Sequence, residues 1–299
     1  MNISAVQPPD DMASCMLYTG IGCVSAISIL GILGLTGNLM VLRIHYQKVI
    51  MKPAEIYICA LAILDVIYNT GGLAVIIWFD YVGMILGRAH TFFAVKVSSY
   101  VCCFLTFTSL SYIFLLALER FISIYFPFYQ GRTNGRAKAQ LLIAPALVGG
   151  IAYAAWYMPL LYIVVYPLAL IITMLYGLVL FKVVATKQKK GKEGVSKQEI
   201  SVAINCAAIS IISVVLLVPC TIAFQFFIME DFKNWFLTQF VDCNVFVLIN
   251  TTHHPMLGIN YMFHPYLLFM TSTRYKENLK SMVSSTSQVQ TSSLAHSSK

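Results

Sequence analysis

"AQLLIAPALVGGIAYAAWYMPLLYIVVYPLALIITMLYGLVLF", residues 139–181, is the stretch on which the number of helices depends. It runs for 43 residues without a charged residue or a histidine. A single helix of that length would measure about 64 Å at 1.5 Å per residue, which is roughly twice the hydrocarbon thickness of a bilayer. Two passes joined by a tight turn near residues 156–161 fit the stretch better. It therefore predicts two successive transmembrane helices.

The composition of the whole chain is that of a protein embedded in lipid. Hydrophobic residues make up 59% of the sequence and charged residues only 11%, whereas soluble domains have about 25% charged residues. The eight cysteines show no CxxC or His/Cys spacing, so no zinc site is expected. The expected fold is an all-α, seven-transmembrane helix bundle. Its predicted helices cover residues 17–44, 54–79, 92–125, 138–158, 163–187, 198–229 and 244–270.

The distribution of positive charge predicts the orientation of this bundle. Of the 20 Lys and Arg residues, all but Arg88, Lys96 and Lys233 fall on one side of the seven-helix plan. Because Lys and Arg in short loops favour the cytoplasm, we expect an extracellular N-terminus and a cytoplasmic C-terminus. The net charge of +8 then reflects topology and an attraction to anionic inner-leaflet lipids. A nucleic-acid partner is not expected.

Four polar residues lie deep inside predicted helices, where lipid should exclude them. Asp65 lies in "LAILDVIY" near the middle of the second helix, and Asn38, Ser109 and Asn260 lie at a similar depth. An ionisable residue inside a membrane span is a functional hypothesis by default. The carboxyl could take up a proton, or a cluster of oxygens could hold a small cation. Alternatively, the three polar residues only make hydrogen bonds between helices.

Several motifs follow one another in a fixed order along the predicted helices. They are GN with Asn38 in the first helix, LxxxD with Asp65 in the second, Glu119-Arg120-Phe121 at the end of the third, the prolines Pro167 and Pro219 in the fifth and sixth, and "HPYLLF" with Pro265 in the seventh. In this order they resemble the rhodopsin-like (class A) G-protein-coupled receptors over roughly residues 17–282, with Glu119-Arg120-Phe121 in place of [D/E]RY, helix-bend prolines, and an altered NPxxY. The resemblance implies a receptor without catalytic activity, located in the plasma membrane, that binds an extracellular peptide or lipid and activates heterotrimeric G proteins.

The resemblance also implies roles for individual residues. Arg120 would be the latch and the G-protein contact, held in the resting state by Glu119 and by Glu199 of the sixth helix. The alternative is a charge pair that only fixes the depth of the helix. Asp65, Asn38, Ser109 and Asn260 match the family's sodium centre, so an allosteric Na⁺ is the one cofactor considered.

The same resemblance divides the chain into four parts. An extracellular segment (1–16) precedes the bundle (17–270). A short amphipathic eighth helix (271–282) follows, with Tyr275, Leu279 and Met282 expected on its membrane-interface face. The remaining residues (283–299) form a Ser/Thr-rich cytoplasmic tail that should be disordered. Phosphorylation of this tail would create a site for arrestin, and a tail that only solubilises the chain is the alternative.

Several family features are missing. The sequence has Val95 for the usual third-helix cysteine, Leu217 for the sixth-helix tryptophan, His264 for the NPxxY asparagine and Leu268 for its tyrosine. The loop between the fourth and fifth helices is nearly absent, which makes the melanocortin, lysophospholipid and cannabinoid receptors the nearest analogy; a missing exon is the alternative. These losses leave a second hypothesis open, in which the chain has the receptor fold and acts as a binding or scaffold protein that does not signal. A small transporter is disfavoured by the single deep carboxylate and the lack of repeats.

Smaller signals complete the set of expectations. His264 near Asp65 could compete with sodium as an imidazolium and make the site pH-sensitive, or it could be a neutral, hydrogen-bonded histidine. In the fifth helix, Leu175 occupies the usual tyrosine position, unless the register shifts by one to Tyr176. Two further candidates lie on the predicted outer side. Cys15 and Cys243 could form a disulfide, or they could remain two free thiols. Asn2 begins a glycosylation sequon, which could also occur by chance.

Overall fold

The structure, a computed structural model, is all-helical in the residues that it describes. The labelled helices are α1 (Asp10–Tyr46), α2 (Pro53–Ile67), the π-helical η1 (Tyr68–Gly72), α3 (Leu73–Ile76), α5 (Phe92–Tyr125) and α8 (Leu161–Lys189). Further helical turns cover 146–150, 206–216, 258–270 and 275–281. The described residues are 10–46, 51–77, 92–126, 143–144, 146–150, 161–189, 204, 206–216, 256, 258–270, 272 and 275–281.

Four described helices are long and apolar enough to cross a membrane. They are Ile21–Tyr46, Pro53–Gly71, Phe104–Tyr125 and Tyr166–Ala185, and Cys206–Leu216 is a shorter apolar helix. Large apolar side chains point outward from them: Ile32 is 66% exposed, and Leu170 and Phe181 are each 71% exposed. A soluble monomer rarely shows such extended apolar patches. The described helices are therefore consistent with a membrane protein.

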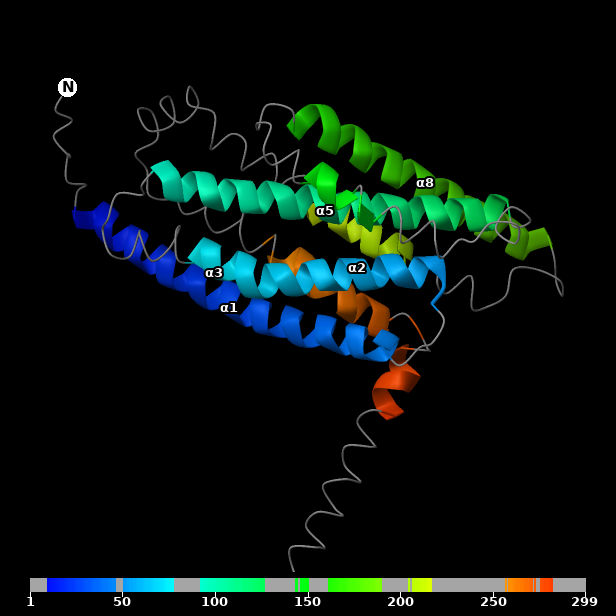
Figure 1. Ribbon diagram of the computed structural model, residues 1–299, viewed down its shortest axis with the longest axis horizontal. Helices are drawn as coiled ribbons and strands as arrows, with labels where there is room; N and C mark the ends of the chain where they lie inside the picture. Colours follow the sequence, from blue (N-terminus) through cyan, green and yellow to red (C-terminus); the bar gives the residue numbers. More distant parts are fainter. Residues whose placement is uncertain are drawn as a thin grey trace, which may run out of the picture.

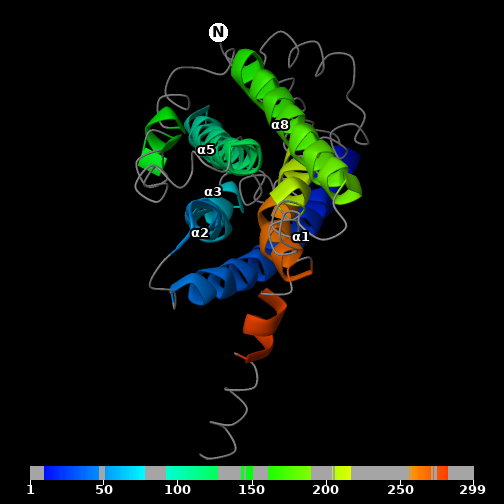
Figure 2. The same ribbon diagram turned by 90° about the vertical axis from the view of Figure 1, so that its right-hand side faces the viewer.

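The helices lie side by side in an order that brings distant segments together. In Figure 1, α1, α2, α5 and α8 follow one another across the molecule, and α5 contacts both α2 and α8. Figure 2 shows the 206–216 and 258–270 helices between α8 and α1. The core that joins them contains Ile27 of α1, Ile113 of α5 and Ile172 of α8, all fully buried.

The ends of the helices agree with local sequence signals. Pro53 begins α2 at a position where its missing N–H costs nothing, and the Glu55 carboxylate accepts the Lys52 backbone N–H at 3.1 Å. The observed α5 matches its predicted range, ending two residues before Pro127. The observed α8 extends the predicted 163–187 by two residues at each end. The first helix begins at Asp10, seven residues before its predicted start, because helical hydrogen bonding continues beyond the apolar residues that set the prediction.

The second predicted helix, 54–79, is not one regular helix. After Ile67 it widens into the π-helix η1, "YNTGG", before α3 continues it. Two side chains support this wider turn by donating to backbone carbonyls: Asn69 Nδ2 to Asp65 at 2.7 Å and Thr70 Oγ1 to Val66 at 2.8 Å. Such π-helical turns occur frequently at functional sites. Apolar periodicity did not predict this one.

Glycines on α1 allow the neighbouring helices to approach closely. A Cβ at Gly34 would lie 2.7 Å from Asn69 Nδ2, and a Cβ at Gly37 would lie 2.7 Å from Cγ of Pro265. Contacts under 3.0 Å are essentially never seen for real Cβ atoms. The position of the 258–270 helix against α1 therefore depends on the missing side chain at Gly37.

We expect Gly37→Ala to lower the melting temperature of the purified protein in detergent. The proline ring at Pro265 cannot rotate away, so overpacking should cost roughly 1–3 kcal/mol. Gly22→Ala is the matched control, since a Cβ there meets nothing within 4 Å. That substitution should leave stability unchanged or raise it slightly, because alanine favours a helix over glycine by about 1 kcal/mol. Equal melting temperatures for the two variants would contradict the close approach.

The short helix 275–281 is anchored to α1 by a buried polar contact. The Tyr275 hydroxyl is hydrogen-bonded to His45 Nε2, and the Tyr275 ring packs edge-on against Phe269 at 6.2 Å between centroids. Tyr275 is buried, and Leu279 packs against the core. Tyr275 therefore faces the end of α1 and not an outer surface, which corrects its expected position. Leu279 is only partly buried, and its place at a membrane interface stays a prediction. Met282 lies outside the described residues.

Tyr275→Phe should loosen this anchor while keeping its apolar packing. Losing one buried hydrogen bond and leaving His45 Nε2 without it should cost about 1–3 kcal/mol locally. We expect faster proteolysis within residues 275–281 in nanodiscs, measured by the rate at which the cut fragment appears. Tyr266→Phe serves as the control, since the Tyr266 hydroxyl donates instead to the Leu33 carbonyl. Equal cleavage of the two variants would refute the anchoring role.

Candidate functional site

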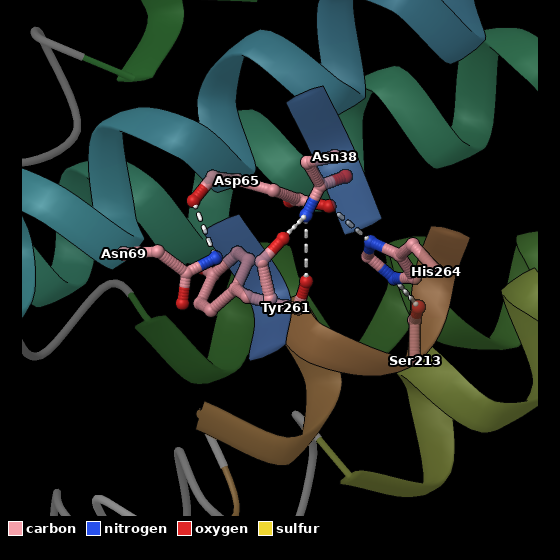
Figure 3. A network of polar contacts seen from close by, with 7 residues as sticks. Asn38, Asp65, Asn69, Ser213, Tyr261 and His264 are labelled. Carbon is pink, nitrogen blue, oxygen red and sulfur yellow. Dashed lines mark hydrogen bonds and ion pairs between the residues drawn. The ribbon is translucent and has the colours of Figure 1, made fainter. Parts of the chain in front are cut away.

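A buried chain of polar side chains crosses the middle of the helices. The Asp65 side chain of α2 is 0% exposed, and its Oδ2 lies 2.8 Å from His264 Nδ1 in the 258–270 helix. The other imidazole nitrogen, Nε2, lies 2.7 Å from the hydroxyl oxygen of Ser213 in the 206–216 helix. Figure 3 shows the imidazole between the carboxylate and the serine. One histidine thus connects three helices.

Two amides extend this network to α1 and to η1. The Asn38 Nδ2 of α1 donates to the backbone carbonyls of Gly34 at 2.9 Å and Tyr261 at 3.1 Å. On the other side, Asn69 donates to the Asp65 carbonyl, and both amides flank Asp65 in Figure 3. The Tyr261 ring packs against Tyr68 with 4.0 Å between centroids. The backbone on either side of Asp65 and His264 is therefore held in place.

Several buried oxygens in α2, η1, α5 and the 258–270 helix have no hydrogen-bond partner within the described part of the chain. They are Asp65 Oδ1, Asn69 Oδ1, Thr108 Oγ1, Ser109 Oγ and Asn260 Oδ1. Buried polar atoms in folded proteins are nearly always paired, with protein or with water. Oxygen ligands of this type suit a small hard cation, and a sodium site at Asp65 stays a prediction. The described residues contain no group of three or more His, Cys, Asp or Glu that could hold a metal.

The structure brings only some of the predicted intramembrane residues into direct contact. Asp65 and His264 are hydrogen-bonded, and Asn38 bonds the backbone of Tyr261, which adjoins Asn260. Ser109 and Asn260 are fully buried but make no side-chain hydrogen bond to the described residues. Sequence reasoning missed Ser213, because a serine in an apolar helix has no distinguishing signal. It also missed Asn69, whose position one helical turn after Asp65 was a usable signal.

A second charged group lies at the C-terminal end of α5. Arg120 is only 9% exposed, and both its Nε and Nη2 lie 2.5 Å from Oε2 of Glu119. The guanidinium is within electrostatic range of Tyr176 in α8 and Cys206 in the 206–216 helix. Among the described residues, the Arg120–Glu119 pair thus lies where three helices meet. Leu175 and Tyr176 are both buried in the core, so the register of the tyrosine position in α8 stays a prediction.

Some of the remaining predicted site residues lie within the described residues and others lie outside them. Pro167 lies inside α8 and Pro265 inside the 258–270 helix, where it contacts α1. A proline inside a helix removes one backbone hydrogen bond and tends to bend the helix, and a bend at these two positions stays a prediction. The side chain of Cys15 is not among those described, although its backbone belongs to α1. Asn2, Glu199, Pro219 and Cys243 lie outside the described residues.

No protein-family model and no curated protein matches this sequence. The function is therefore argued from the site, since a fold alone does not define what a protein does. Two features carry that argument. They are the buried Arg120–Glu119 pair at the end of α5 and the Asp65–His264–Ser213 chain in the centre.

Proposed function

We propose that this chain is a seven-helix receptor of the rhodopsin-like kind, placed in the plasma membrane with its N-terminus outside. It binds an extracellular peptide or lipid and activates heterotrimeric G proteins when its third and sixth helices part at the inner end. In this proposal α5 is the third helix, α8 the fifth and the 206–216 helix part of the sixth. Phosphorylation of residues 283–299 and binding of arrestin remain predictions.

The observation that carries the proposal is the burial of Arg120. A guanidinium that is 9% exposed must have a compensating partner, because an unpaired buried charge is strongly unfavourable. Its only ion pair among the described residues is with the adjacent Glu119, and Tyr176 in the middle of α8 and Cys206 in the 206–216 helix lie within electrostatic range of it. Moving the 206–216 helix outward would expose Arg120 to a partner at the inner surface. A ligand that favours one of the two arrangements can then shift the equilibrium.

The central polar residues would set the resting equilibrium. Asp65, Ser109 and Asn260 supply the oxygens that would hold a sodium ion, which would add a positive charge beside the buried carboxylate. His264 already engages one carboxylate oxygen, Oδ2, and leaves Oδ1 for other donors. Asn38 and Asn69 position the backbone on both sides. These residues therefore link α1, α2 and the 258–270 helix, and His264 also links them to the 206–216 helix through Ser213.

The proposal is tested by nucleotide exchange on purified heterotrimeric G proteins of each class. The full chain in nanodiscs is assayed alone and with pools of lipids and peptides, against empty nanodiscs. We expect exchange above the empty control with at least one G-protein class, with or without ligand. Ligand binding without exchange for any class would favour the non-signalling binding protein, and charge movement under voltage clamp would favour a transporter. Either result would overturn the proposal.

A further inference from the structure

We propose that Ser213 is the positioning residue that couples the central polar chain to the outward movement of the 206–216 helix. The proposal rests on the function proposed above, but its test does not require a G protein. It concerns the contact between Ser213 and His264, which the resemblance to receptors does not imply. The hydrogen bond at 2.7 Å joins two helices whose bonded residues are 51 positions apart in the sequence.

The geometry makes His264 a two-sided connector. Its Nδ1 meets Asp65 and its Nε2 meets Ser213, and all three side chains are at most 3% exposed. An ionised carboxylate only accepts hydrogen bonds, so Nδ1 donates to Asp65 in that state. In the neutral imidazole, Nε2 then accepts the hydroxyl proton of Ser213. Each donor in this series of hydrogen bonds thus faces an acceptor, and the imidazole ring links α2 to the 206–216 helix.

The 206–216 helix carries this link to the Arg120 site. Cys206, Ser210 and Ser213 follow one another at spacings of four and three, which places them on one helical face, and all are fully buried. Ser213 meets His264 at one end of this face, while Cys206 lies within electrostatic range of Arg120 at the other. The two positions are about 10 Å apart along the helix axis. A rotation of this helix about its axis that separates Ser213 from His264 would also turn Cys206 away from Arg120, because the two residues lie on one face.

This arrangement is the kind of element through which two sites can be coupled. Coupling requires an element with two arrangements whose equilibrium both sites influence. In the arrangement observed, the buried Nε2 and the serine hydroxyl satisfy each other. In the opened arrangement both would lose that partner, which disfavours opening. A change at Asp65 or His264 would therefore alter how often Arg120 becomes exposed.

The experiment uses the native thiol of Cys206 as the reporter. Full-length protein in nanodiscs is treated with a membrane-permeable alkylating reagent, and labelling of Cys206 is followed by peptide mass spectrometry. Ser213→Val is compared with Ser213→Thr, because valine and threonine have the same shape and differ only in the hydroxyl. We expect Cys206 to be labelled about five- to tenfold faster in Ser213→Val than in Ser213→Thr, the ratio expected for one lost hydrogen bond.

Two controls separate coupling from general loosening. Cys23 in α1, which is 3% exposed, should be labelled at the same rate in both variants. His264→Leu should abolish the difference between valine and threonine at position 213, since neither then has a partner. Equal labelling of Cys206 in the two Ser213 variants would overturn the proposal, as would a parallel rise at Cys23. A chain that activates no G protein but shows the expected labelling would retain this coupling and lose only the proposed function.

Discussion

Arg120→Ala is expected to reduce nucleotide exchange on the G protein more than tenfold while leaving ligand binding in place. The guanidinium is the buried cation at the end of α5, and the proposed opening presents it to the G protein. Truncating a central interface arginine of this kind commonly costs 2 kcal/mol or more, which corresponds to over tenfold in affinity. The measurement is the exchange rate at saturating G protein and at limiting G protein, with ligand binding recorded on the same preparation.

Arg43→Ala is the matched control for this prediction. It removes the same charge from the last turn of α1, where Arg43 is exposed, and should change exchange less than about twofold, as expected for a surface charge. Glu119→Gln provides the complementary test. It removes the anion bonded to Arg120, so basal exchange should rise. Signalling by Arg120→Ala equal to that of the unmodified chain would show that the pair only fixes helix depth.

The largest effect on stability is expected for His264→Leu. This substitution removes the group bonded to Asp65 Oδ2 and leaves a fully buried carboxylate without its partner. Breaking a buried pair from one side commonly costs about 3–5 kcal/mol. The melting temperature in detergent, followed by a thiol-reactive dye or by loss of monodisperse protein, should fall well below that of the unmodified chain.

The double variant Asp65→Leu/His264→Leu is the decisive control. Replacing both members of a buried polar pair with apolar groups is often neutral or stabilising, so the double variant should be more stable than His264→Leu alone. His264→Asn should lie between them, because its amide can still donate to the carboxylate. If the double variant is as unstable as the single one, the cost comes from lost packing of the imidazole and not from the buried carboxylate.

The parts of the fold that follow from hydrophobicity could be predicted from the sequence. The predicted and observed ranges of α5 are the same, and those of α8 differ by two residues at each end. Apolar length and helix-ending prolines determine such ranges, and both can be read directly. The π-helical turn at Tyr68–Gly72 could not be found in this way, since its composition is equally compatible with a regular helix that contains glycines.

For the site, too, residues that stand out by their chemistry could be predicted from the sequence, whereas residues that matter through their packing partners could not. Asp65 and Arg120 were found because charged residues in apolar helices are rare, and His264 was found because it replaces the asparagine of a motif that the resemblance implies. Ser213 was missed because its importance comes from the partner that packing brings to it. Tyr275 was assigned to the membrane interface because an amphipathic pattern shows which side chains share a face. That pattern does not show whether the face meets lipid or, as here, the end of α1.

The widened turn at Tyr68–Gly72 also bears on how this segment of the chain can change its length. A π-turn holds one more residue than the α-helical turn it replaces, so a one-residue deletion there would restore a regular helix. Each α-helical residue advances the rotation by about 100°. A deletion inside a regular α-helix would therefore rotate every residue that follows it, whereas here the widened turn already absorbs the extra residue, and Leu73 beyond it would keep its place against Gly31. The extra residue can thus be gained or lost without disturbing the packing on either side of the turn.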